Sequence, residues 1–511
     1  MQVTRRSSLR LATLIGVAAF APPLASAVGE GEKVEPASPH EGGERKKEPG
    51  MTVAGSLPAD SSFSFNFDAQ GRSLPIKATA GSIKLTNSGG TAVAEIGTIA
   101  YVLEGAGAGR PVTFAINGGP GASSAWLHIG AIVPWRLPMQ GLAPSSPPAL
   151  VDNAESWLPF TDLVFIDPPD TGYSRIVGGA DARKSLLSVN GDIDGLAGAI
   201  RRWLVANSRL ASPKFIVGES YGGFRGPRLA KTLATEAGVG ITGLLLVSPV
   251  LDFGQLFGAA HGPFPSLTRL PSYAAVLREK SGPVTRANLA DVEAYAVGDY
   301  LSDWLKGPRD HAAVARIEAR VGELTGLDPT LVTRVGGIVG EDDFVNESAR
   351  PLGEVRALYD ATVTAYDPFP DSFRSRALDP VLPGFEPAFA SAIVDLYEKK
   401  FGWRLEQRYE LINDEVNGNW NWDSSRRPAE AMTALRQMLA LDPRFRVVVA
   451  HGLTDVQAPY FGTQLQLDQI PDFGAPGRVT LNAYPGGHML YSRDDSRKAL
   501  RDDARRLIEG A

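Results

Sequence analysis

A serine enclosed by glycines is the part of this sequence whose residue types most directly suggest chemistry. The stretch FIVGESYGG, residues 215–223, sets Ser220 between Gly218 and Gly222, directly after an apolar run. Small neighbours are needed where a strand turns sharply into a helix, because a larger side chain would collide with the backbone of the turn. Such a turn exposes a hydroxyl beside the free N–H groups of a helix N-terminus. The pattern predicts a nucleophilic serine, although an ordinary strand–turn–helix junction can share this short sequence.

A serine hydroxyl is a weak nucleophile at neutral pH, so this hypothesis requires a base and an acid that orients the base. Of six histidines, His488 is the best candidate, because it lies on the Gly-Gly loop of AYPGGHMLY after an apolar run. Asp455, in VVVAHGLTDVQAP, also follows an apolar run and precedes His488. The order serine, acid, histidine is the one expected when the serine stands on a strand-to-helix turn of a doubly wound sheet.

Other acids and histidines compete for these roles. Asp252 follows the strand after the expected nucleophile helix, whereas Asp442 precedes its strand and so lies at the wrong end. His451 also ends a strand and has no assigned role. Position favours Asp455 and His488.

A second glycine-rich loop could stabilise negative charge. INGGPGASSAW, residues 116–126, directly follows an apolar run. Acyl transfer forms an oxyanion, which needs two preorganised N–H donors. The Gly119 N–H and the N–H of Tyr221, the residue after the serine, are the expected pair.

The elements that must position these residues follow from the apolar runs. Short runs without alternation are typical of parallel strands buried on both faces, and they occupy 112–118, 162–169, 214–220, 241–249, 444–452 and 478–487. Helix-like stretches separate them, and from about residue 62 an alternating pattern indicates antiparallel strands and hairpins. The sequence predicts an α/β fold with a doubly wound, mostly parallel sheet and N-terminal antiparallel strands.

Composition shifts divide the chain into five parts. An N-terminal Arg-Arg pair, an apolar stretch and Ala25-Ser26-Ala27 predict an export signal at 1–27, which resembles the twin-arginine type. Residues 28–60 are rich in Gly, Pro and charge and predict a disordered linker. The sheet domain is expected at 61–253 and 436–511, interrupted by a mainly helical cap at 254–435.

Composition also excludes some functions. The net charge of −6 provides no basic surface, so nucleic acid is not an expected partner. Without any cysteine, the chain has neither a thiol nucleophile nor a cysteine-ligated metal site. The apolar N-terminal stretch is short and ends in two prolines, so no stable membrane insertion is expected after signal cleavage. The serine chemistry needs no metal or other cofactor.

Five motifs in one order resemble the serine carboxypeptidase family of α/β-hydrolases, over roughly residues 90–505. They are NGGPGASS, DPPDTGYS at 167–174, GESYGG, the Asp455 loop and YPGGHM. The resemblance implies that Ser220 is the nucleophile, His488 the base and Asp455 its orienting acid. It also implies an oxyanion hole made by Gly119 and Tyr221.

The resemblance further implies a site for the free carboxylate of a peptide's C-terminus, formed by Asn117, Gly118 and Glu219. Two carboxylates repel unless one is protonated, so such recognition works best in acid. Members of the family have a second Glu where this chain has Ala131, and a Cys where it has Ala122. These departures leave the three catalytic residues in place.

The resulting expectation is an exported, periplasmic or secreted serine carboxypeptidase acting on peptides through an acyl-enzyme. The alternatives are an esterase, an acyltransferase or an aminopeptidase of the proline iminopeptidase type with the same residues, or a binding protein on an inactive hydrolase fold. Trp420 and Trp422, in VNGNWNWDSSRRP, could line a substrate pocket or pack between cap and sheet. The oligomeric state is left open.

Overall fold

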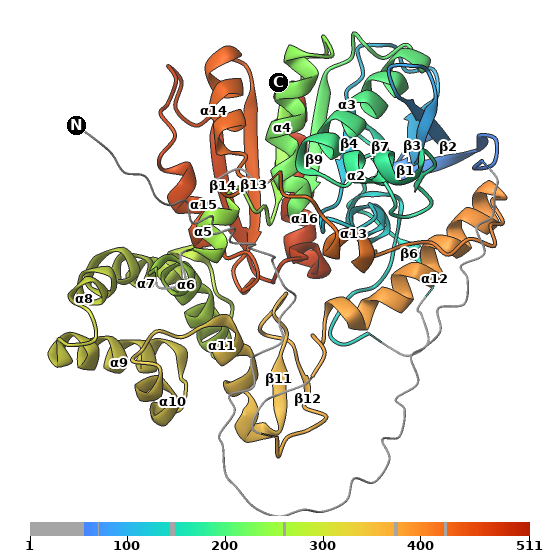
Figure 1. Cartoon of the computed structure of the whole chain (residues 1–511). Coiled ribbons are helices and arrows are strands. Elements are labelled where there is room, and N and C mark those ends of the chain that lie inside the picture. Colours follow the sequence, from blue (N-terminus) through green and yellow to red (C-terminus); the bar gives the residue numbers. More distant parts are fainter. Residues whose placement is uncertain are drawn as a thin grey trace, which may run out of the picture. The chain divides into compact units, whose positions relative to one another are not determined.

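In the computed structural model, the apolar runs of the sequence become neighbouring strands of one mixed sheet (Figure 1). The order across the sheet is β1-β2-β3-β7-β4-β9-β10-β13-β14, and β8 also pairs with β3. The N-terminal strands are β1 (Ser61–Ala69), β2 (Arg72–Thr86), β3 (Ala92–Leu103) and β8 (Arg175–Ile176). The central strands are β4 (Val112–Ile116), β7 (Asp162–Ile166), β9 (Lys214–Glu219), β10 (Gly243–Val247), β13 (Arg446–Gly452) and β14 (Val479–Tyr484).

The pairing directions agree with the sequence pattern. β1, β2 and β3 pair antiparallel, as does β3 with β7. From β7 through β4, β9, β10 and β13 to β14, every neighbouring pair is parallel. The predicted doubly wound, mostly parallel sheet with antiparallel N-terminal strands is confirmed.

The structure describes residues 56–69, 71–143, 149–258, 262–372, 377–423 and 427–510, all within the unit Gly55–Ala511. The predicted export signal at 1–27 and most of the predicted linker at 28–60 lie outside these ranges, and both stay predictions. No helix within the described ranges is long and apolar enough to span a bilayer.

Alternate strand residues separate two hydrophobic layers. On β9, Ile216 packs with the helices α3 (Val189–Ala206), α4 (Tyr221–Thr235) and α14 (Met432–Leu441). Its neighbours Phe215 and Val217 pack on the other face with α12 (Leu382–Phe401) and α16 (Asp494–Glu509). Because side chains alternate along a strand, apolar residues at every position fill both layers.

Between β10 and β13 the chain is mainly helical. The helices are α5 (Phe253–Phe257), α6 (Phe264–Glu279), α7 (Ala290–Tyr295), α8 (Leu301–Lys306), α9 (His311–Thr325), α10 (Pro329–Arg334), α11 (Glu341–Glu347), α12 and α13 (Asp414–Gly418). A hairpin of β11 (Glu354–Arg356) and β12 (Thr364–Tyr366) interrupts them. Figure 1 shows α6–α11 grouped together. Their core includes Leu453 and Val456, just beyond β13, so this group packs at the carboxyl end of the sheet.

The last helix of this region packs differently. α14 begins inside the predicted cap, 254–435, and lies against α4 on the face of the sheet. The helix therefore belongs to the layer that covers β9 and β10. The predicted domain boundaries themselves stay predictions.

The remaining elements are short connections near the strand ends. They are α1 (Ala125–Leu127), a π-helical turn η1 (His128–Ile132), the pair β5 (Trp135–Arg136) and β6 (Val151–Asp152), α2 (Gly179–Leu186), α15 (Tyr460–Leu467) and the 3₁₀ turn η5 (Leu490–Ser492). Three further turns within the helical region are η2 (Arg286–Leu289), η3 (Ala296–Tyr300) and η4 (Arg350–Leu352).

Candidate active site

Ser220 is the single residue between the end of β9 and the start of α4, where the chain turns sharply. Its backbone has φ 59° and ψ −121°, a conformation that residues with a side chain rarely adopt. A side chain on Gly218 would bring its Cβ within 2.0 Å of the Gly222 carbonyl oxygen, and one on Gly222 would come within 2.3 Å of the Ile116 oxygen. The glycines around the serine are therefore required by backbone contacts.

His488 and Asp455 meet at the carboxyl end of the sheet. Asp455 follows β13 and His488 follows β14, and the His488 Nδ1 lies 2.7 Å from the Asp455 Oδ2. Both side chains are buried, and the Ala458 N–H also donates to the Asp455 Oδ1 at 2.9 Å. His488 Nε2 has no hydrogen-bond partner among the described residues. Asp455 thus holds His488 Nδ1, while Nε2 is able to accept a proton.

Asp455 and Glu219 together outweigh the effect of burial on the pKa of His488. Burial acts to lower the pKa of His488, but the charge and hydrogen bond of Asp455, together with the charge of Glu219, raise it above its ordinary value. The imidazolium that forms during proton transfer is therefore stabilised.

The loop after β4 lies against the N-terminus of α4. A Cβ on Gly118 would lie 2.5 Å from the Tyr221 nitrogen. Gly119 has φ +96°, which suits glycine. Within the described ranges, neither the Gly119 N–H nor the Tyr221 N–H donates to another backbone group. Two free donors thus lie on the elements that flank Ser220.

A buried arginine holds this loop in place. Arg225, on α4, donates from Nη1 to the carbonyl oxygens of Asn117 (2.5 Å) and Gly118 (3.2 Å). Its Nε and Nη2 donate to Asp192 on α3, at 2.7 and 3.2 Å. Both side chains are fully buried. With the carbonyl oxygens turned toward Arg225, the orientation of the loop's peptide groups is fixed.

Asn117 and Glu219 are in direct contact beside the serine. Asn117 Nδ2 donates to Glu219 Oε2 at 2.9 Å, and the Asn117 Oδ1 accepts from the Leu127 N–H at 3.0 Å. Tyr491 adds a second donor, since its hydroxyl lies 3.1 and 3.0 Å from the two Glu219 oxygens. Burial raises the pKa of Glu219 to about 7, against the lowering effects of His488, Tyr491 and Asn117.

Tyr491 and Arg225 were not predicted from the sequence. Tyr491 ends the stretch AYPGGHMLY that contains His488, and Arg225 lies five positions after Ser220, but neither residue type at these positions indicates a role. Their roles depend on contacts with residues far away in the chain.

Trp420 and Trp422 pack against Tyr221, the residue that follows Ser220. Trp420 and Trp422 pack edge-on against the Tyr221 ring, with centroids 5.6 and 5.8 Å away, and Trp422 also contacts Phe253. Trp420 belongs to the hydrophobic layer around α4. These contacts favour packing between the helical region and the sheet, while the substrate pocket role of the pair stays a prediction.

The rival residues are engaged elsewhere. Asp252 caps α5 through the Gly254 N–H (2.7 Å), and Asp442 accepts from the Arg444 N–H (2.8 Å). His451 is buried, its Nε2 lies 2.9 Å from Thr463 Oγ1, and burial lowers its pKa to about 3. His451 is therefore a neutral, packed side chain.

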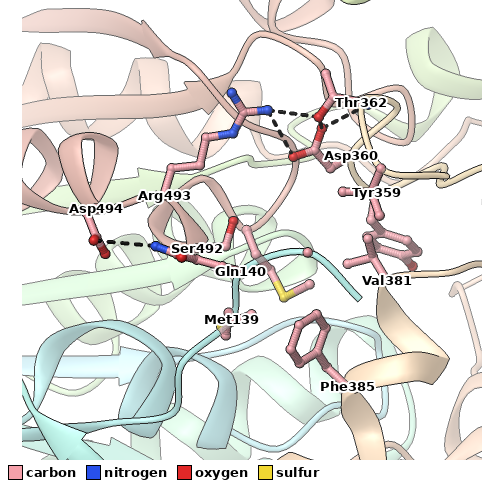
Figure 2. A pocket seen from close by; sticks show the side chains of 13 residues that line it. Met139, Gln140, Tyr359, Asp360, Thr362, Val381, Phe385, Ser492, Arg493 and Asp494 are labelled. Atoms are coloured by element: carbon pink, nitrogen blue, oxygen red, sulfur yellow. Dashed lines mark hydrogen bonds and ion pairs between the residues drawn. The ribbon is translucent and has the colours of Figure 1, made fainter. Parts of the chain in front are cut away.

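A cavity of about 340 Å³ lies near His488, and Figure 2 shows the side chains that line it. Met489 and Tyr359 line it, and the Tyr359 ring lies edge-on to the His488 imidazole, 5.3 Å between centroids. Val381 and Phe385 of α12 add apolar walls, while Figure 2 shows Arg493 bonded to Asp360 and Thr362 at the opposite side. The cavity is large enough for an amino acid side chain, and two of its lining residues, Tyr359 and Met489, adjoin the candidate base.

Comparison with known proteins finds a family match for part of the chain. Residues 104–254 match the family model of the serine carboxypeptidases. The similarity to the family is limited to this segment. It contains Asn117, Gly118, Gly119, Glu219, Ser220 and Tyr221, and the family supports a serine-type peptide hydrolase. Asp455 and His488 lie beyond the serine carboxypeptidase segment, so their assignment depends on the geometry described above.

One solved structure supports the fold. The prohormone-processing carboxypeptidase Kex1Δp from Saccharomyces cerevisiae is similar with a TM-score of 0.54 at 15% identity, covering 85% of this chain and 90% of that chain. A proline iminopeptidase from Mycobacterium smegmatis has a TM-score of 0.37 at 13% identity, covering 84% of this chain and 98% of that chain. No curated protein matches the sequence. The α/β-hydrolase fold of the serine carboxypeptidase segment and its surroundings is confirmed.

Proposed function

We propose that this protein removes single residues from the C-terminus of peptides, with Ser220 as nucleophile, His488 as base and Asp455 as the acid that orients it. The observation that carries the proposal is the 2.7 Å contact between His488 Nδ1 and Asp455 Oδ2. Nε2 is left without a partner among the described residues, at the same sheet edge as the Ser220 turn.

The reaction proceeds in two steps, acylation of Ser220 and hydrolysis of the acyl-enzyme, and His488 transfers a proton in each. Ser220 Oγ attacks the scissile carbonyl carbon while His488 Nε2 takes its proton. The N–H groups of Gly119 and Tyr221 stabilise the oxyanion, and His488 then protonates the leaving amine. Water attacks the acyl-enzyme by the same route and releases the shortened peptide with free Ser220.

We infer that Asn117, Gly118 and Glu219 bind the substrate's terminal carboxylate. Asn117 can donate an N–H, and a protonated Glu219 can donate its hydroxyl to the anion. Burial raises the pKa of Glu219 to about 7, so the protonated form is available well above the ordinary range of a carboxylic acid.

The leaving residue has a place beside the base. The leaving amine must lie near His488 to receive its proton. Tyr359, whose ring contacts that imidazole, lines the cavity together with Met489. We propose that the side chain of the released residue enters this cavity. Its walls of Met139, Val363, Val381 and Phe385 suit an apolar side chain.

Export is part of the proposal. The N-terminal pattern supports transport out of the cytoplasm, to the periplasm or beyond the cell. Cell fractionation of the full chain, compared with a chain in which Arg5 and Arg6 are both replaced by Lys, tests this inference. Retention of the doubly substituted chain in the cytoplasm supports a twin-arginine route.

The enzymatic test compares a blocked dipeptide that has a free C-terminal carboxylate with its C-terminal amide, from about pH 4 to about pH 8. We expect faster cleavage of the free acid, with a preference that fades as the pH rises. Ser220→Ala should abolish both activities and labelling by a fluorophosphonate probe, whereas Ser302→Ala, at an exposed serine of α8, should change neither.

Other outcomes separate the alternatives. Equal cleavage of acid and amide, or cleavage of simple esters alone, would indicate an esterase or another hydrolase with the same residues. An unlabelled Ser220 in the folded protein would exclude the serine hydrolase mechanism.

A further inference from the structure

The hydroxyl of Tyr491 lies on the carboxyl group of Glu219. It is 3.1 Å from Oε1 and 3.0 Å from Oε2, and both residues are almost fully buried. Tyr491 reaches this position from η5, the turn that directly follows His488 and Met489. One short segment therefore supplies the candidate base, a wall of the leaving-residue cavity and a partner for Glu219.

Small residues on η1 make room for the tyrosine ring. A Cβ on Gly130 would approach Tyr491 Cε2 to 3.1 Å, closer than most real contacts. The next residue is Ala131, where the family resemblance implies a second Glu. Tyr491, a neutral phenol, thus packs against η1 and hydrogen-bonds Glu219.

Four groups face Glu219 from the elements around it. Asn117, after β4, and Tyr491, on η5, are neutral hydrogen-bond donors. His488, after β14, and Asp455, after β13, act through their charge, the first favouring and the second opposing ionisation of Glu219.

The difference between a phenol and a second acid is chemical. Two adjacent carboxyl groups share one proton, because both cannot ionise together. A tyrosine hydroxyl donates its proton in a hydrogen bond but keeps it, so it stabilises the ionised form of the neighbouring carboxyl. Burial of Tyr491 and the charge of Glu219 both raise the pKa of the phenol, so the hydroxyl stays protonated.

We propose that Tyr491 is a specificity-determining residue, which hydrogen-bonds Glu219 in place of a second acid and thereby sets the pH above which a C-terminal carboxylate is rejected. The inference rests on the proposed carboxypeptidase function. Below that pH, Glu219 is protonated and donates to the substrate anion. Above it, the ionised Glu219 accepts from Tyr491 and Asn117 and repels the substrate.

The test uses the ratio of kcat/KM for the blocked dipeptide acid to kcat/KM for its amide, measured against pH. His488 must be deprotonated for both substrates, so its titration cancels in the ratio. The midpoint of the fall in the ratio reports Glu219 in the free enzyme. Tyr491→Phe removes the donor and keeps the ring, so we expect the midpoint to move to higher pH by roughly one pH unit.

A matched control removes a similar hydrogen bond elsewhere. Tyr460, on α15, donates to Glu293, on α7, at 2.8 Å, so Tyr460→Phe should leave the midpoint unchanged. Glu219→Gln should make the ratio independent of pH, and Tyr491→Phe added to it should produce no further shift. Tyr491→Leu, which also lacks the hydroxyl, should reproduce the upward shift and serves if the Phe variant fails to fold.

The outcomes distinguish this inference from the function on which it rests. A ratio that falls with pH in the parent protein but has the same midpoint in Tyr491→Phe would overturn the role of Tyr491 and leave the carboxypeptidase assignment intact. A ratio near one at every pH in the parent protein would overturn both. A downward shift in Tyr491→Phe would show that the hydroxyl stabilises protonated Glu219, which also contradicts the inference.

Discussion

At the residue scale, His488 and Glu219 require opposite protonation states for cleavage of a peptide with a free C-terminal carboxylate. His488 must lose its proton to act as a base, and Asp455 and Glu219 raise its pKa above the ordinary value despite burial. Glu219 must keep its proton to bind the substrate's carboxylate, and burial raises the pKa of Glu219 to about 7. The two requirements therefore limit activity on a free carboxylate from opposite sides of the pH range.

These requirements predict different pH profiles for two substrates. With the C-terminal amide, kcat/KM should rise with pH through the pKa of His488 and then level off. With the free acid, it should rise and then fall near pH 7 as Glu219 ionises, giving a bell. Steady-state kinetics on both substrates checks this. If kcat/KM for the free acid stayed level at high pH, Glu219 would be excluded as the group that binds the substrate carboxylate.

Arg225 is a positioning residue for the loop after β4. Its guanidinium joins the Asn117 and Gly118 carbonyl oxygens to Asp192, so it connects the expected oxyanion loop to α3 and α4. An unpaired buried charge is costly, because the partner left behind is neither solvated nor neutralised.

Arg225→Gln should therefore reduce both stability and activity. We expect a loss of about 3–5 kcal/mol in the free energy of unfolding, from the unpaired Asp192. Combining Arg225→Met with Asp192→Leu should restore much of the stability but not kcat, because the loop carbonyls still lack their donor. Urea unfolding and kcat measure the two effects, with Arg228→Gln on the same helix as the control. Recovery of kcat in the double variant would show that Arg225 is purely structural.

At the scale of elements, the turn between β9 and α4 depends on backbone contacts. Gly218, near the end of β9, lies in close contact with the Gly222 carbonyl group. Gly223 lies against Pro249, and a Cβ added to Gly223 would come within 2.3 Å of the proline Cβ. The strand, the turn and the helix can pack together only where these positions have no side chain.

Gly218→Ala should deform this turn. The added methyl would meet backbone atoms rather than a flexible side chain, so we expect a loss of at least about 1–3 kcal/mol in the free energy of unfolding. Activity should fall further, since Ser220 would be displaced. Gly240→Ala, where a Cβ meets nothing within 4 Å, is the control for replacing a glycine. Equal melting temperatures and rates for the two variants would contradict the close contact at Gly218.

At the scale of the whole molecule, the cavity beside His488 combines segments far apart in the chain. Met139 and Gln140 come from the loop after β5, Val363 from the β11–β12 hairpin, Phe385 from α12 and Arg493 from the loop after η5 (Figure 2). The helical region thus supplies walls of a site whose reactive groups belong to the sheet domain.

Filling this cavity should change specificity rather than chemistry. Val363→Trp should lower kcat/KM for dipeptides ending in Phe by at least about tenfold, while peptides ending in Ala are affected much less. The comparison of the two peptides in steady-state assays is the measurement, with Val205→Trp, at an exposed position of α3, as control. Equal losses for both peptides would place the released side chain elsewhere.

The sequence alone determined much of this protein. Apolar runs such as 112–118 and 214–220 predict buried parallel strands, since only residues buried on both faces can be apolar throughout. Gly218 and Gly222 identify Ser220, because a tight turn excludes side chains on both sides. Asp455 and His488 could be selected by their positions after strands, since parallel strands bring their carboxyl ends to one edge.

Only the tertiary structure decided how the surroundings of these residues are built. Tyr491 reaches Glu219, Arg225 reaches the Asn117 carbonyl, and the tryptophan pair packs behind Tyr221. Such contacts join segments up to hundreds of residues apart, so no local pattern of residue types records them. Local steric rules act between neighbours in the chain and can be read from sequence, whereas hydrogen bonds and cavities depend on which distant surfaces the folded chain brings together.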